Sequence, residues 1–189
     1  MEFNLQSFLL LIAFYCIGSI PFALIVQRLM GTNDPRKHGS MNPGATNMFR
    51  IAGPLAGIAT FLGDFLKGFI PILFLAPDSI TYGYIYSLSL LVGHTFSIFN
   101  NLSGGKGVAT SFGFILALNH IVGVIIILIW LLIFLIKRVS GLSAIISFIS
   151  LPIVIYFMTN SFMFFLISIL HSIIILMNHR KNIRELLQS

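Results

Sequence analysis

The sequence predicts an all-α integral membrane protein: a bundle of seven transmembrane helices, some of them short, joined on the cytoplasmic side by glycine-rich loops. Three observations support this fold class. Of the 189 residues, 57% are apolar and only 8% are charged, whereas an ordinary soluble domain carries roughly a quarter charged residues. The mean hydropathy is +1.00, so much apolar surface must face lipid. The apolar residues also form long unbroken runs, which favour helices over a closed barrel.

Six apolar runs divide the chain, and one of them is too long for a single crossing. The fourth run, 108–136, would reach about 44 Å at roughly 1.5 Å per residue, beyond a hydrocarbon core of about 30 Å. Asn119 and His120 interrupt this run, so we divide it there. The result is a single membrane domain over 1–189 with seven segments. These are 5–27, 51–76, 80–98, 108–118, 121–136, 142–158 and 162–178.

Positive charge between the runs predicts the orientation, because short loops rich in Lys and Arg stay in the cytoplasm. Seven segments with the N-terminus outside and the C-terminus cytoplasmic leave no Lys or Arg in the outside loops, near Asp78, Asn119 and 159–161. Six segments would separate Lys137 from Lys106. The first run is interpreted as a retained anchor, since no positive charge precedes it. The cytoplasmic basic residues are Arg28, Arg36, Lys37, Arg50, Lys106, Lys137, Arg138, Arg180, Lys181 and Arg184.

The charge pattern and composition also exclude several function classes. The net charge is +6, but the basic residues punctuate apolar runs and form no stripe of the kind that binds nucleic acid. The single cysteine, Cys16, excludes a disulfide framework. The five acidic residues and the five histidines are dispersed, so we expect no metal site and no cofactor.

The first polar segment, GTNDPRKHGSMNPGATNMFR at 31–50, packs small hydrogen-bond donors and cations between two apolar runs. Glycine lets backbone N–H groups approach an anion, and hydroxyl and amide side chains add neutral donors. An arginine can close a bidentate contact on a phosphate. A solvated linker is the alternative, but the density of donors favours an anion site. The candidate ligands are Ser40, Asn42, Gly44, Thr46, Asn47 and Arg50.

The second polar segment, NNLSGGKGVATS at 100–111, places Gly104, Gly105 and Gly107 around Lys106, just before an apolar helix. Free N–H groups at a helix start carry partial positive charge, and a lysine beside them adds a full charge on phosphate oxygens. The segment is not a nucleotide P-loop, because the GxxxxGK[ST] spacing is absent. The alternative is a glycine-rich turn whose lysine only sets the orientation.

Two further polar segments lie on the same predicted side. In KRVSGLSA at 137–144, Ser140 and Ser143 stand at a helix entrance, where Ser140 either caps the helix or donates to a ligand. In NHRKNIRELLQS at 178–189, His179 and Asn182 share a face if the segment is helical. The basic residues around them, Arg180, Lys181 and Arg184, are expected to contact anionic lipid headgroups.

Ionisable residues also occur within the apolar runs, where they are costly unless they have a partner or face a cavity. Asp64 and Lys67 are three residues apart, so they can form an ion pair on one helix. Contact with substrate is the alternative for this pair. His94 lies at the cytoplasmic end of the third run, where it either orients the glycine loop or has a purely structural role.

Taken in order, these segments resemble the bacterial membrane glycerol-3-phosphate acyltransferase family called PlsY. The resemblance covers essentially the whole chain, and it implies a seven-helix bundle in the bacterial inner membrane with a cytoplasmic active site. The chain departs from the family pattern at Met41, Ser97 and Ser103, where glycine, proline and a basic residue are common, and it lacks the glycine-glutamate pair after the last leucines. The matching motifs are GSIPFALIV at 18–26, GSMNPGATNMFR at 39–50, Asp64 with Lys67-Gly68, VGHTFSIFNNLSGGKGVAT at 92–110, VSGLSAI at 139–145 and HRKNIRELL at 179–187.

The resemblance implies transfer of a fatty acyl group from acyl phosphate to the 1-hydroxyl of sn-glycerol 3-phosphate, giving lysophosphatidate and phosphate. No histidine has an acid five residues on, so we expect substrate-assisted catalysis, in which the substrate's own phosphate takes the proton. His179 as general base is the competing mechanism. The predicted catalytic residues are Lys106, Arg50, Ser40, His179 and Asn182, and Gly104, Gly105, Gly107, Ser140 and Ser143 join the first-loop ligands in binding substrate.

Two further expectations concern partners and alternatives. The resemblance implies a soluble phosphate acyltransferase that supplies the acyl phosphate, beside the lipid bilayer itself. From a different class, a transporter of small phosphorylated anions would also use glycine loops, serines and cations. Transporter sites usually lie near the membrane midplane, whereas these candidates gather at one face.

Overall fold

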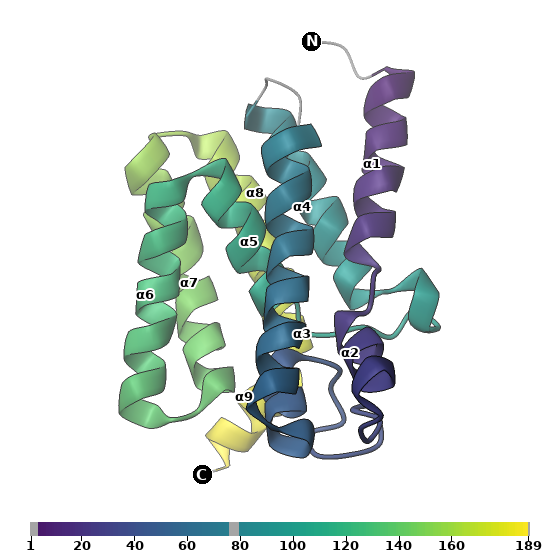
Figure 1. Ribbon diagram of the computed structural model, residues 1–189. Helices are drawn as coiled ribbons and strands as arrows, with labels where there is room; N and C mark the ends of the chain where they lie inside the picture. Colours follow the sequence, from purple (N-terminus) through teal and green to yellow (C-terminus); the bar gives the residue numbers. More distant parts are fainter. Residues whose placement is uncertain (1–3, 76–79, 189) are drawn as a thin grey trace.

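The computed structural model describes residues 4–75 and 80–188, and every regular element in those ranges is helical. Figure 1 shows the long helices packed side by side, running alternately toward and away from the end where the C-terminus lies. The predicted outside loop near Asp78 lies outside the described residues. The elements are α1 Leu5–Gly18, α2 Phe22–Met30, α3 Ala45–Leu75, α4 Ile80–Thr95, the 3-10 helix η1 Ile98–Asn100, α5 Val108–Leu118, α6 His120–Lys137, α7 Ser140–Thr159, α8 Phe162–Asn178 and α9 Arg180–Leu187.

The helices carry the surface expected of a membrane protein. Many large apolar side chains are exposed, for example Phe157 and Phe74, and in lipid this exposure has no cost. Within the described residues, four helical stretches are long and apolar enough to cross a membrane, and the bent pair α8 and α9 makes a fifth if it is counted as one span. The four stretches are Leu5–Met30, Ala45–Phe74, His120–Lys137 and Ser140–Thr159. Helices α4 and α5 are shorter, with 16 and 11 residues.

A helix break lies at Asn119, where the sequence places one. Asn119 has extended backbone (φ −152°), and its side chain accepts hydrogen bonds from the N–H groups of Ile121 and Val122. An asparagine in this position satisfies donors that the first turn of a helix leaves free. The polar residue therefore ends α5 and begins α6 in one step.

Other element boundaries differ from the sequence-based expectation. The run 5–27 is two helices, because Pro21 lacks a backbone N–H and the helix breaks before it. The run 51–76 begins six residues early, at Ala45, and bends at Gly53 (φ 86°), which precedes Pro54. The run 80–98 ends at Thr95, and the tail after Asn178 is the separate helix α9. One apolar run can therefore hold two helices, and the described residues form more helices than the seven predicted segments.

Close helix packing sets the positions of α4 and α5, which lead into the second polar loop. A Cβ atom on Gly93 of α4 would lie 2.2 Å from the Tyr15 carbonyl oxygen of α1. A Cβ atom on Gly113 of α5 would lie 2.1 Å from the Phe65 carbonyl oxygen of α3. Small residues let membrane helices approach backbone to backbone in this way. These contacts hold α4 and α5 in a rigid frame.

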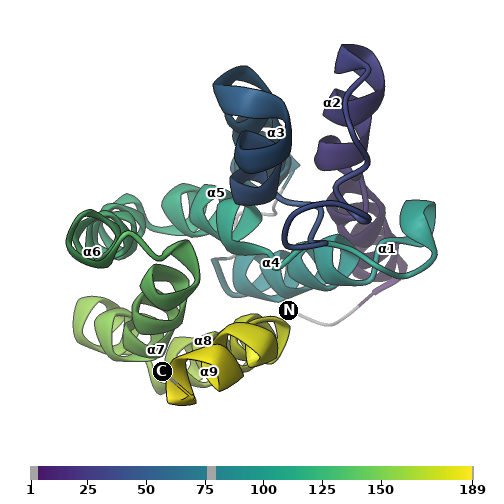
Figure 2. The same cartoon turned by 90° about the horizontal axis from the view of Figure 1, so that it is seen from below.

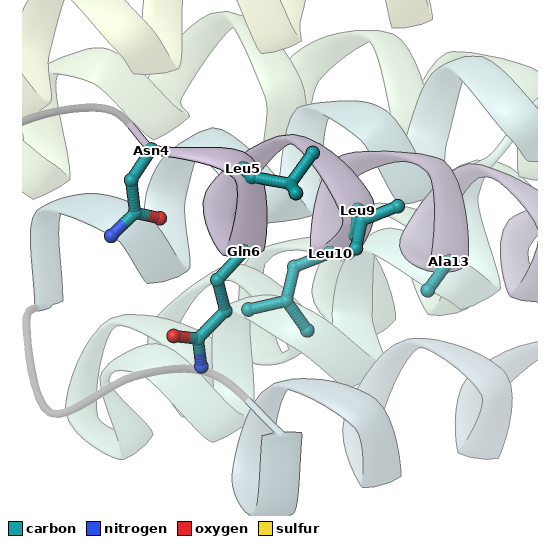
Figure 3. Close-up of a pocket in the computed structure, with 6 residues that line it drawn as sticks. All are labelled: Asn4, Leu5, Gln6, Leu9, Leu10 and Ala13. Atoms are coloured by element: carbon teal, nitrogen blue, oxygen red, sulfur yellow. The ribbon is translucent and has the colours of Figure 1, made fainter.

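The polar loops gather at the end of the bundle opposite the N-terminus (Figure 1). Seen from that end, the segment after α2 crosses the segment before α5, and α9 lies across from them (Figure 2). The other end holds an open groove of about 610 Å³ along the first turns of α1 (Figure 3). Among the described residues, its lining contains no charged side chain: Asn4, Leu5, Gln6, Leu9, Leu10 and Ala13.

Candidate active site

The first polar loop is organised from within by Asn47. The side chain of this residue is buried, its Oδ1 accepts the Ser40 N–H at 2.9 Å, and its Nδ2 donates to the carbonyl oxygens of Pro35 (2.9 Å) and His38 (3.0 Å). These three hydrogen bonds of the Asn47 amide therefore fix the shape of the loop. Direct contact between Asn47 and substrate stays a prediction, and the structure gives this residue the task of presenting Ser40.

A second set of contacts ties this loop to the glycine loop. Arg36 forms an ion pair with Asp34 at 2.7 Å, and its Nη1 donates to the Asn100 Oδ1 at 2.7 Å. The hydrogen bonds from Arg36 lower the pKa of Asp34 to about 2. Asn100 in turn donates to the Ser103 carbonyl oxygen. From sequence, Arg36 indicates only the orientation and Asn100 does not stand out, because nothing local distinguishes these two residues from others in the loops.

The glycines of the second loop serve a different purpose from the one predicted. The N–H groups of Gly104 and Gly105 donate to the carbonyl oxygens of Thr95 (2.9 Å) and His94 (3.2 Å) at the end of α4. These two N–H groups are therefore taken by α4, and contact of Gly104 and Gly105 with substrate stays a prediction. A Cβ atom on Gly104 would lie 1.8 Å from the His94 carbonyl oxygen, so glycine is needed there for close approach to α4.

Free donors do occur at the next residues, where α5 begins. Gly107 adopts left-handed backbone (φ 88°) and is the N-cap of α5, without a side-chain capping bond. In the described part of the chain, no acceptor takes the N–H groups of Lys106, Gly107 and Val108. The start of α5 is thus an open helix N-terminus, which carries partial positive charge.

Lys106 stands at this open helix start and meets the C-terminal segment. Its Nζ donates to the Asn182 Oδ1 of α9. Burial lowers the pKa of Lys106; Glu185 raises it, while Lys181 and Arg50 lower it further. Arg50 is itself exposed, and it forms no ion pair with any described acidic residue. The charge of Arg50 thus acts on Lys106, although the two residues belong to segments far apart in the sequence.

The first and second loops also touch directly at Gly105. A Cβ atom on this glycine would lie 2.5 Å from the His94 Nε2 and 3.0 Å from the Pro43 carbonyl oxygen. Pro43 belongs to the donor-rich part of the first loop, next to Asn42 and Gly44, which are partly buried; Thr46 is exposed. The segment around Ser40 and the segment around Lys106 are therefore neighbours in space.

The third and fourth polar segments meet through Asn182. A Cβ atom on Gly141 would lie 2.9 Å from the Asn182 Nδ2, so α7 and α9 are in close contact beside Lys106. Ser140 is not the cap of α7, because the N-cap is Val139. Ser143 is buried, and its hydroxyl donates to the Val139 carbonyl oxygen at 3.0 Å.

Two residues at the end of α8 complete the surroundings. Asn178 donates from its Nδ2 to the Thr95 Oγ1 at 3.0 Å and to the Lys106 carbonyl oxygen at 3.5 Å. Asn178 does not stand out in the sequence, because an amide at a helix end is commonly a capping residue. His179 is buried and donates from Nδ1 to the Ile175 carbonyl oxygen at 2.8 Å. Burial lowers the pKa of His179 to about 4.

A buried ionic cluster lies behind the glycine loop. Lys67 Nζ is 2.7 Å from Asp64 Oδ1 and donates to the Ile20 carbonyl oxygen at 2.7 Å. The His94 Nδ1 is 3.7 Å from the same Asp64 oxygen and 3.1 Å from the Thr110 Oγ1. Asp64 and Lys67 thus form the structural ion pair, and their burial argues against contact with substrate.

Gly105→Ala is expected to reduce turnover by about 10- to 100-fold, since displacement of a positioned group by an ångström or less has effects of this order. The added methyl would push against the Nε2 of His94 and the carbonyl oxygen of Pro43. The measurement is the steady-state rate in detergent. Ser103→Ala is the control, because this exposed neighbour on the same loop should keep its rate. Equal rates for Gly105→Ala and Ser103→Ala would show that the close packing of Gly105 against His94 and Pro43 does not affect turnover.

The fold and this cationic end define the class of protein: a multi-pass integral membrane protein whose polar loops gather at one end of the helix bundle. The family model for glycerol-3-phosphate acyltransferase matches residues 8–189. The chain therefore belongs to the glycerol-3-phosphate acyltransferase family of PlsY type, a family of phospholipid biosynthesis, as its motifs indicate.

Individual relatives agree with this placement along nearly the whole chain. The glycerol-3-phosphate acyltransferase of Paraburkholderia phytofirmans is 37% identical over 190 residues, covering 97% of this chain and 89% of the relative. That of Ruthia magnifica is 40% identical over 189 residues, covering 98% and 95%. Among solved structures, the integral membrane glycerol 3-phosphate acyltransferase PlsY in its glycerol 3-phosphate form has a TM-score of 0.89 at 36% identity. Its lysophosphatidic acid form has a TM-score of 0.86 at 34% identity, and both alignments cover 96% of this chain and 92% of the neighbour.

Proposed function

We propose that the protein transfers a fatty acyl group from acyl phosphate to the 1-hydroxyl of sn-glycerol 3-phosphate, releasing lysophosphatidate and phosphate. The observation that carries this proposal is the direct contact of the donor-rich first loop with the glycine loop at Gly105, beside Lys106 and the open N-terminus of α5. A reaction of two phosphorylated substrates needs two neighbouring positive sites. The glycerol 3-phosphate and lysophosphatidic acid forms of the solved PlsY relative supply the matching acceptor and product chemistry.

The reaction forms one carbon–oxygen bond and breaks another. The acceptor hydroxyl oxygen attacks the acyl carbonyl carbon, the bond from that carbon to the phosphate oxygen breaks, and the phosphate leaves with the electron pair. The hydroxyl proton passes to a phosphate oxygen of the substrate itself. Because a mixed anhydride already has a good leaving group, the protein has mainly to position the reactants and stabilise negative charge.

The residues divide between the two substrates. Arg50, Ser40 and Thr46 hold the phosphate and glycerol oxygens of the acceptor, within a loop that Asn47 shapes. Lys106 and the free N–H groups at the start of α5 stabilise the charge that develops on the donor, and Asn182 and His179 orient it. Asn42, Gly44, Gly107, Ser140 and Ser143 complete the proposed lining.

We further propose seven membrane crossings in the bacterial inner membrane, with the N-terminus outside and the site facing the cytoplasm. The clustering of Lys and Arg in the loops at one end supports this orientation. A soluble phosphate acyltransferase is the proposed source of the acyl phosphate. The acyl chain would lie along apolar helix surfaces that continue into the bilayer.

The direct test uses purified protein with acyl phosphate and glycerol 3-phosphate. We expect free phosphate and lysophosphatidate in equal amounts, with no phosphate release when the acceptor is left out. Anion transport is the competing function, and it would appear as uptake of labelled glycerol 3-phosphate into liposomes without any donor. Uptake without phosphate release would overturn the proposal.

His179→Gln separates the two proton-transfer mechanisms. We expect turnover to fall by no more than about 10-fold, because a positioning residue is less costly to lose than a general base. A pKa near 4 for His179 keeps the ring neutral near neutral pH, so the variant should retain the wild-type pH profile there. Loss of turnover with intact substrate binding, together with a mild effect of Lys106→Ala, would instead establish His179 as the base.

A further inference from the structure

The environment of Lys106 contains a negative charge that a phosphate site does not require. Glu185 on α9 accepts a hydrogen bond at 3.5 Å from the Nδ2 of Asn182, whose Oδ1 accepts from Lys106. Of the described acidic residues, Asp34 is paired with Arg36 and Asp64 with Lys67. Glu185 is exposed, and it has no basic partner within ion-pair distance in the described residues.

The two hydrogen bonds orient the amide of Asn182. When Nδ2 donates toward the carboxylate, Oδ1 faces Lys106 and accepts from its ammonium group. The opposite orientation would turn the NH2 group toward the ammonium, where neither group can accept. Glu185 thus selects the orientation of Asn182 that suits Lys106.

The same carboxylate also acts on charge. The charged groups that affect the pKa of Lys106 are Glu185 and Lys181 from α9 and Arg50 from α3. The charge of Lys106 in turn lowers the pKa of His179. Glu185 favours the ammonium form of Lys106 against the effect of burial. A phosphate that binds Lys106 brings two more negative charges toward that carboxylate, and like charges repel.

We propose that Glu185 is a positioning residue of the Lys106 site that also sets its affinity: it orients Asn182 and weakens the binding of doubly charged phosphate there. This inference rests on the proposed function of Lys106 as the site of the donor phosphate. Because phosphate binds more weakly, the inorganic phosphate product is released faster. The carboxylate of Glu185 thus lowers the affinity for phosphate and raises turnover.

The test compares Glu185→Gln with Glu185→Ala at low ionic strength. Glutamine keeps an acceptor for Asn182 and removes the charge, so the KM for acyl phosphate and the inhibition constant of inorganic phosphate should both fall by about two- to five-fold, the range of exposed charge pairs. Turnover should fall in Glu185→Gln by no more than that factor, because the phosphate product leaves more slowly, and fall further in Glu185→Ala, which cannot orient the amide. The alkaline limb of the Glu185→Gln pH profile should move to lower pH, because the pKa of Lys106 loses the support of the carboxylate.

Salt dependence and a neighbouring variant provide the controls. The difference between Glu185→Gln and wild type should vanish near 1 M salt, where the Debye length is about 3 Å. Arg184→Gln, one residue away on the exposed side of α9, should not lower either constant. Unchanged constants for Glu185→Gln at low salt, or a change that salt does not reduce, would overturn the inference. If Lys106→Ala kept full activity, the proposed site itself would be wrong; an inactive Lys106→Ala beside an unaltered Glu185→Gln would refute the role of Glu185 alone.

Discussion

Lys106→Ala is expected to lower turnover by about 100- to 1000-fold, the usual effect of removing one donor that stabilises developing charge. The lysine is the cation at the open start of α5, and alanine leaves only the helix N–H groups facing the donor phosphate. The measurement is phosphate release at saturating concentrations of both substrates. Lys106→Arg should recover little of this loss, because a planar guanidinium does not reproduce a compact ammonium group.

Lys137→Ala is the matched control for this prediction. Lys137 is an exposed lysine at the end of α6, and its loss changes the net charge by the same amount. We expect it to keep at least half of the wild-type turnover. Equal losses in the two variants would mean that the overall basic charge, and not the position of Lys106, supports the reaction.

Lys67→Met is expected to destabilise the fold by about 3–5 kcal/mol, because it leaves the buried Asp64 carboxylate without its cation. Lys67 also donates to the Ile20 carbonyl oxygen at the break between α1 and α2, and this bond is lost as well. Thermal unfolding in detergent, followed by circular dichroism, measures the effect. The double variant Asp64→Asn with Lys67→Met removes both charges and should regain most of the lost stability.

The exposed ion pair of Asp34 and Arg36 offers the comparison for Lys67→Met. Surface pairs contribute about 0–1 kcal/mol, and the Arg36 side chain is 44% exposed. Arg36→Gln should therefore unfold within a few degrees of wild type. If Lys67→Met proved as stable as Arg36→Gln, the buried ion pair would not stabilise the fold as predicted.

The helical class and the location of the polar chemistry follow from local patterns. Apolar runs predict helices wherever they are long, and Asn119 marks a break because its side chain caps the next helix. The opening of α3 at Ala45 does not stand out in the sequence, because residues 45–50 include the polar Thr46, Asn47 and Arg50. Pro21 signals the break after α1, but a proline also fits the first turn of a helix, so its position alone does not decide.

The candidate site could be assembled from the sequence only as far as charge and topology allow. Placing four polar segments on one side brings Lys106, Arg50 and Asn182 to the same end of the bundle. The partner of each N–H group, however, depends on tertiary contacts. The N–H groups of Gly104 and Gly105 appear free in sequence, and in the fold they donate to the last carbonyls of α4.

The shortness of α5 has a consequence for how deep the chemistry occurs. Helices α5 and α6 meet at Asn119, and Figure 1 shows both descending from this common point, with α5 ending well above the far end of α6. At roughly 1.5 Å per residue, 11 residues reach about 16 Å and 18 residues about 27 Å. The start of α5 at Val108 therefore lies about 10 Å closer to the shared break than the far end of α6. In the proposed reaction, the water-borne acceptor has to enter the bundle to that depth, while the lipid-anchored donor reaches it from the side with its acyl chain still in the bilayer.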